Sequence, residues 1–124
     1  MINETFGWCS VLAGIALGLY MGRKFEREDW LGGYNAFPRR MVRLAHIALV
    51  AIGILNVQFA QSAPRLRLNT ALETVASFAL MAAAVLMPAC CLWIAPRRRH
   101  FEIFAAPVAC LAGGVMLTIG GLIR

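Results

Sequence analysis

Long apolar stretches alternate with short polar or basic ones along the chain. The apolar runs cover residues 6–22, 42–61, 71–95 and 101–123. Each run is close to the roughly 20 residues that a helix needs to cross a bilayer. Backbone polar groups in lipid are satisfied only in helices or closed barrels, and the runs lack strict alternation, so helices are expected. The pattern predicts an all-α integral membrane protein, a four-helix bundle in which four transmembrane helices form two antiparallel hairpins.

The amino-acid composition also indicates that lipid rather than water surrounds most of the chain. Hydrophobic residues make up 60% of the chain and charged residues 15%, whereas a soluble domain has about 45–50% and about 25%. A domain of 124 residues is too small to bury that excess in its own interior. We therefore expect one transmembrane domain over residues 1–124, with the lipid bilayer as its main partner.

The net charge of +6 is concentrated beside the apolar runs. This placement favours membrane topology and anionic headgroups over nucleic acid, and no nucleic-acid partner is expected. Nine basic residues flank the first and third connections: Arg23, Lys24, Arg27, Arg39, Arg40, Arg43, Arg97, Arg98 and Arg99. The opposite side has three: Arg65, Arg67 and Arg124. The excess predicts a multi-pass protein of the cell (inner) membrane with both termini outside the cytoplasm.

The first connection, residues 23–41, is the only long one. Its charged residues are mixed with Phe25, Trp30, Leu31, Tyr34 and Phe37. Such a mixture is typical of an amphipathic segment in the headgroup region, with its rings anchored at the interface. An ordinary solvated loop is the alternative. The Gly32–Gly33 pair should interrupt any helix there.

Small residues recur at helical spacing in the first and last runs. Side chains three, four or seven positions apart share a helix face, and small ones let two helix backbones approach closely in lipid. The predicted packing positions are Ser10, Gly14, Gly18 and Gly22 in the first run, and Gly113, Gly114, Gly120 and Gly121 in the last. The pattern leaves open whether the partner helix belongs to this chain or to another.

The few polar side chains that lie deep in the runs are His46, Asn56, Gln58, Ser77 and Thr118, and none of them is a carboxylate. Carriers driven by protons or cations generally need a buried acid, so a transporter or channel is disfavoured. His46 is the one ionisable group within the second run. One interpretation is that its neutral ring hydrogen-bonds a neighbouring helix.

The second interpretation of His46 is a cofactor ligand. A b-type haem would use His46 with His100 or Met87 as axial ligands, and Arg39 and Arg43 would pair with the propionates. A copper-type metal site would instead combine His46 with Cys90 and Cys91. No spacing in the sequence is diagnostic of either site. The cysteines lie in apolar runs, so a disulfide framework is not expected.

Two functions follow from these alternatives. The first is an accessory or structural subunit of a larger membrane complex, which would bind other membrane subunits or form a homo-oligomer. The second is a haem-binding or metal-binding electron-transfer subunit of a respiratory or photosynthetic complex. Nucleophilic catalysis is not favoured, because no acidic residue could orient His46 toward Cys90 or Cys91 at that depth.

Overall fold

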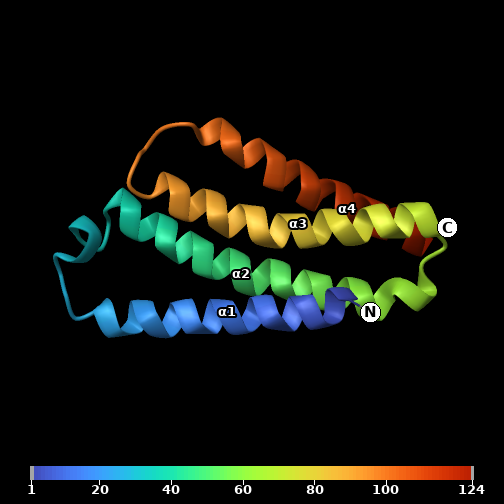
Figure 1. Ribbon diagram of the computed structural model, residues 1–124, viewed down its shortest axis with the longest axis horizontal. Helices are drawn as coiled ribbons and strands as arrows, with labels where there is room; N and C mark the ends of the chain where they lie inside the picture. Colours follow the sequence, from blue (N-terminus) through green and yellow to red (C-terminus); the bar gives the residue numbers. More distant parts are fainter. Residues whose placement is uncertain (1, 124) are drawn as a thin grey trace.

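The computed structural model describes residues 2–123 and contains four long helices. They are α1 (Ile2–Lys24), α2 (Phe37–Ser62), α3 (Thr70–Ile94) and α4 (Ala105–Ile123) (Figure 1). Short 3-10 turns lie at Trp30–Gly32 (η1), Ala63–Arg65 (η2) and Phe101–Phe104 (η3), and the described range has no strand. The predicted all-α bundle of four helices is confirmed.

Each helix is long and apolar enough to cross a bilayer. The four spans are Ile2–Lys24, Phe37–Arg65, Thr70–Ile94 and Phe101–Ile123. The chain is therefore a multi-pass membrane protein. The helices alternate in direction, so the two basic connections lie together at one end of the bundle and both chain ends lie at the other (Figure 1). We call residues 23–43 and 97–102 together the basic end.

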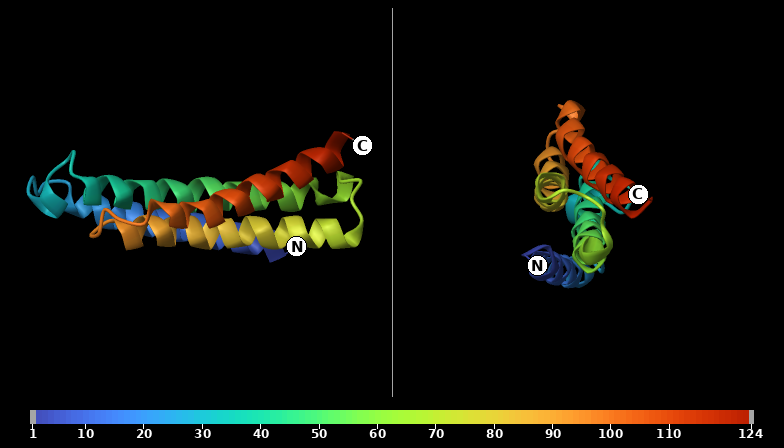
Figure 2. Two further views of the ribbon diagram at one scale, coloured as in Figure 1. Left: turned by 90° about the horizontal axis from the view of Figure 1, so that it is seen from above. Right: turned by 90° about the vertical axis from the view of Figure 1, so that its right-hand side faces the viewer.

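Neighbours in sequence are also the main neighbours in space. α1 packs on α2, α2 on α3 and α3 on α4. Seen end on, α1 and α4 lie at opposite ends of the group, with α2 and α3 between them (Figure 2). The bundle is therefore open, and both flanking helices expose a broad apolar surface, from which Leu12 of α1 and Met116 of α4 project.

The helix boundaries have local causes. α2 begins at Phe37, five residues before the apolar run, because Pro38 lies in the first turn, where a missing N–H is not needed. Arg39 and Arg40 therefore belong to a helix rather than to a loop. α3 is capped by Asn69, whose side chain accepts a hydrogen bond from the backbone N–H of Leu72 at 2.8 Å.

The core lies between α2, α3 and α4. In the middle of the bundle, Ala48 and Ile52 of α2 meet Ala83 and Ala84 of α3. Nearer the chain ends, Phe59 packs on Ala76 and Leu80, and side chains of α4 cover them. Alanine at these contacts lets the helices approach closely, which is the main source of packing energy in lipid.

Candidate functional site

α1 and α2 meet along a ridge of glycines. A Cβ added to Gly7 would lie 2.6 Å from the backbone oxygen of Gly53, and one added to Gly14 would lie 2.6 Å from a methyl carbon of Val50. Both distances are shorter than van der Waals contact, so the two backbones touch directly. The sequence analysis did not predict Gly7 and Gly53 as packing positions, although Gly7 extends the row of Ser10, Gly14 and Gly18 by one turn.

The last residue of that predicted row behaves differently. A Cβ added to Gly22 would meet nothing within 4 Å. The α4 glycines also divide into two kinds. A Cβ on Gly114 or Gly121 would lie 2.8 Å from Leu80 or Leu68, respectively, whereas one on Gly113 or Gly120 would meet nothing within 4 Å. Neighbouring glycines thus lie on different faces of α4: one pair contacts the rest of the chain and the other is open.

A buried amide network joins α1, α2 and α3. Asn3 and Asn56 are both 0% exposed, and the Asn3 amide donates to the side-chain oxygen of Asn56 at 2.9 Å. The Asn56 amide in turn donates to the backbone oxygens of Ile52 at 3.0 Å and Leu80 at 3.1 Å. The Ser77 hydroxyl donates to the Asn3 side-chain oxygen. Sequence reasoning missed Asn3, which lies four residues before Gly7 on the same face.

Two further side chains bond across the α1–α2 contact. The Ser10 hydroxyl donates to the backbone oxygen of Leu49 at 2.8 Å. Nδ1 of His46 lies 2.7 Å from the backbone oxygen of Gly14, so this nitrogen carries the proton and donates. A Cβ on Gly18 would lie 2.8 Å from Cε1 of His46, so the ring fits only because Gly18 has no side chain. This is an interhelical bond of the kind that the first interpretation of His46 predicts.

The other predicted ligands lie elsewhere. Ala48, two residues after His46, faces α3, and Met87 packs against the cluster around Ala48. Cys91 lines the same side of the bundle, in an apolar groove of about 450 Å³ between α2, α3 and α4. Since His46 faces α1, the structure places His46 and the pair Met87 and Cys91 on opposite faces of α2.

The remaining candidates are not gathered around His46 either. The sulfur of Cys90 lies 3.7 Å from the backbone oxygen of Ile103. His100 is an exposed loop residue whose Nδ1 lies 3.3 Å from Oε1 of Glu102. Arg39 and Arg43 lie at the basic end against aromatic rings. Among residues 2–123, no three His, Cys, Asp or Glu side chains are close enough to hold a metal ion. A haem or metal role for His46 stays a prediction without a second ligand beside it.

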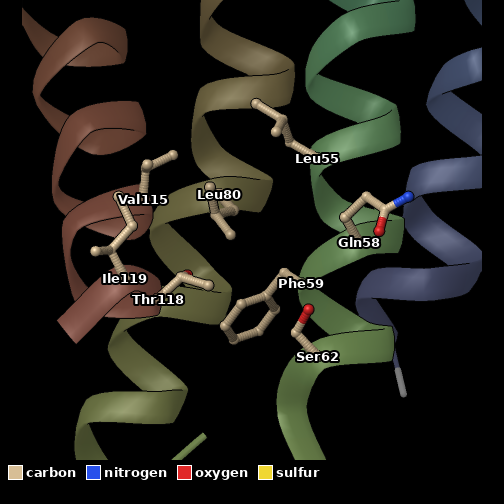
Figure 3. Close-up of a pocket in the computed structure, with 8 residues that line it drawn as sticks. All are labelled: Leu55, Gln58, Phe59, Ser62, Leu80, Val115, Thr118 and Ile119. Atoms are coloured by element: carbon tan, nitrogen blue, oxygen red, sulfur yellow. The ribbon is translucent and has the colours of Figure 1, made fainter. Parts of the chain in front are cut away.

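The cavities of the bundle are mainly apolar. One of them, with a volume of about 120 Å³, lies between α2, α3 and α4, and its lining side chains are drawn in Figure 3. Its lining residues are Leu55, Gln58, Phe59, Ser62, Leu80, Val115, Thr118 and Ile119. The Thr118 hydroxyl already donates to the backbone oxygen of Gly114 at 2.7 Å. Such a surface suits acyl chains better than a polar substrate.

Comparison with known proteins adds no family to this picture. No protein-family model, no curated protein and no solved structure matches the chain.

The His46 contact makes a testable prediction. The amide nitrogen of asparagine can occupy the place of Nδ1, so His46→Asn should keep the bond to Gly14, whereas His46→Ala should lose about 1 kcal/mol of the free energy of unfolding. Reversible unfolding in bicelles would measure both. A visible absorption spectrum of the purified protein is the companion test: a Soret band that disappears in His46→Ala would instead support haem ligation.

Proposed function

We propose that this protein is a non-catalytic subunit that packs against other helices in a membrane complex. The observation that carries the proposal is how the bundle uses its polar side chains. Asn3, Ser10, His46, Asn56 and Ser77 all make bonds between helices. Among the described residues, no buried side-chain nitrogen or oxygen lacks a hydrogen-bond partner. The polar side chains of the interior are thus used to hold the helices together.

The outward glycines of α4 support a role in packing. Gly113 and Gly120 are seven residues apart, so they lie on one face of the helix. Both are open on that face, and the adjoining Met116 is 73% exposed. A face of this kind lets a second helix come close enough for van der Waals contact and Cα–H bonds in lipid. The proposed partner is another membrane subunit or a second copy of this chain.

Filling this face tests the proposal. We expect Gly113→Leu/Gly120→Leu to abolish association while the bundle stays folded, because a Cβ added at either position meets nothing within 4 Å. Association would be measured by cross-linking in native membranes and by co-purification in a mild detergent. The matched control is Ala13→Leu/Ala16→Leu, which adds similar bulk to exposed positions of α1.

Two results would contradict the proposal in different ways. A wild-type chain that remains a single monomer in membranes and in mild detergent would remove the subunit role. An assembly that survives the α4 double variant but not the α1 control would keep the subunit role and move its contact to α1.

A further inference from the structure

At the basic end, the first connection folds over a single arginine. The guanidinium carbon of Arg39 lies 5.2 Å from the ring centre of Phe25, 5.4 Å from that of Trp30 and 5.5 Å from that of Tyr34. Arg39 is 2% exposed. We call these three rings and Arg39 the Arg39 cage. A guanidinium is planar and weakly hydrated, so it stacks on aromatic faces where an ammonium would fit less well.

The cage gives the connection a defined shape. Trp30 also packs edge-on against Tyr20 of α1, with ring centres 6.2 Å apart. Gly32 and Gly33 adopt φ values of 84° and 99°, a left-handed conformation that lets the chain turn back toward α2. Arg43 then holds the end of the turn, because its guanidinium lies 4.5 Å from the Tyr34 ring centre and donates to the Tyr34 backbone oxygen at 3.3 Å.

The second basic connection joins the same surface. The guanidinium of Arg98 lies 5.1 Å from the ring centre of Phe37, the first residue of α2. Phe37 in turn meets Phe101 edge-on, with ring centres 5.9 Å apart. The arginines of both loops are thereby presented side by side among aromatic rings.

The positive charge of this surface is not neutralised within the chain. The basic end has nine basic and four acidic side chains, so it carries +5 of the total charge of +6. Within the described residues of the basic end, the only ion pair is His100 with Glu102, and it involves none of the arginines of this end. The side chains of Arg23, Arg27, Arg40, Arg97, Arg98 and Arg99 are exposed.

We propose that the basic end is a binding surface for anionic phospholipid headgroups, and that the Arg39 cage positions the first connection for this contact. Exposed guanidiniums would bind the lipid phosphates, since they form paired charge-assisted hydrogen bonds with phosphate oxygens. The aromatic rings suit the boundary between headgroups and acyl chains, where tryptophan and tyrosine are enriched. The surface continues directly from the transmembrane ends of α1, α2 and α3, so it lies at headgroup depth when these helices span the bilayer.

The test uses the full chain in detergent with equal amounts of phosphatidylglycerol and phosphatidylcholine. Native mass spectrometry would report the ratio of the two lipids bound. We expect phosphatidylglycerol to be preferred, and Arg27→Gln/Arg40→Gln to reduce that preference by about fivefold or more. Arg65→Gln/Arg67→Gln, at the opposite end, is the matched control and should change it less than twofold.

Arg39→Lys separates the cage from simple charge. It keeps the positive charge but loses the planar group, so we expect the preference to fall by a similar factor while the helices stay folded by circular dichroism. Trypsin should then cleave faster at Arg27. Full lipid preference in Arg39→Lys would overturn the role of the cage. Equal binding of both lipids by the wild type, or displacement of phosphatidylglycerol by an equal concentration of RNA oligonucleotide, would overturn the lipid surface itself.

This measurement needs no protein partner, so its result is independent of whether the chain is a subunit of a complex. A chain that prefers anionic lipid but never assembles would keep the present inference and remove the proposed function. A chain that assembles but shows no lipid preference would keep the proposed function and remove the present inference.

Discussion

Replacement of Gly7 by leucine is expected to detach the first turns of α1 from α2 and to lower the free energy of unfolding by about 3 kcal/mol. The reason is the nature of the atom that the new side chain meets. The added Cβ would lie 2.6 Å from the backbone oxygen of Gly53 and 3.0 Å from the backbone nitrogen of Val57. A side chain can rotate away from such a clash, but a helix backbone cannot, so the helices must separate.

The loss should extend beyond the contact itself. Asn3 lies one turn from Gly7, and its amide reaches Asn56 only while α1 remains close to α2. Separation would leave two buried amides without each other. The unfolding free energy in bicelles measures the total loss, and cross-linking between cysteines introduced on α1 and α2 would report the separation.

Gly22→Leu is the matched control for this experiment. It places the same side chain on the same helix, four turns away, where an added Cβ meets nothing within 4 Å. Its expected effect is within about 0.5 kcal/mol. Leucine is a better helix former than glycine, so helix propensity cannot destabilise either variant. Equal destabilisation by both substitutions would therefore mean that the contact with Gly53 does not account for the effect, and close packing of α1 would be contradicted.

These glycines also show which features of the fold the sequence predicts and which it does not. The number of helices follows from the length of the apolar runs, because the bilayer sets the required length and leaves no other backbone solution. The direction in which each glycine faces does not follow. Gly113 and Gly114 are adjacent and identical in type, yet only Gly114 contacts α3. That difference depends on the rotation of α4, which is set by its packing against Leu80.

Arg39 at the basic end is a second case in which the sequence predicts the segment but not the position of one residue. The sequence predicts an interfacial segment from the mixture of rings and charges between residues 23 and 41. It does not predict that one arginine of the set is buried and surrounded by rings. The burial of Arg39 requires Pro38 to start the helix early and the glycine pair to turn the chain, and only both together bring Trp30 over the first turn of α2.

The polar interior is the feature that sequence reasoning found in part. Asn56 and Ser77 stand out because polar residues are rare in the runs, and His46 stands out as the ionisable one. Asn3 lies before the first apolar run, so its place in the membrane was not predicted. α1 in fact begins at Ile2, and the bond to Asn56 places Asn3 more than a turn below the end of α2.

Asn56 should therefore be the most sensitive polar position in the bundle. Asn56→Leu keeps the number and branching of the side-chain atoms but removes three hydrogen bonds. Two of them join helices, one from Asn3 and one to the backbone oxygen of Leu80, and the third lies within α2, to the backbone oxygen of Ile52. Interhelical hydrogen bonds in membranes contribute about 0.6 kcal/mol each, with a maximum near 1.7 kcal/mol, so the loss of two of them is expected to cost about 1–2 kcal/mol. Asn56→Ala adds a cavity between three helices, which should raise the loss to about 3 kcal/mol.

Gln61→Ala, at an exposed position on the same helix, is the control for both variants. The comparison of their free energies of unfolding shows whether the amide network stabilises the bundle. Gln61→Ala should have an effect within about 0.5 kcal/mol. If Asn56→Leu were as stable as the wild type, the amides would add no stability, and glycine and alanine packing alone would hold α1. If it were unstable as expected, the amides would also explain how the bundle selects one register. A row of small residues can slide by one turn with little loss of contact, whereas a buried amide that slides loses its partner.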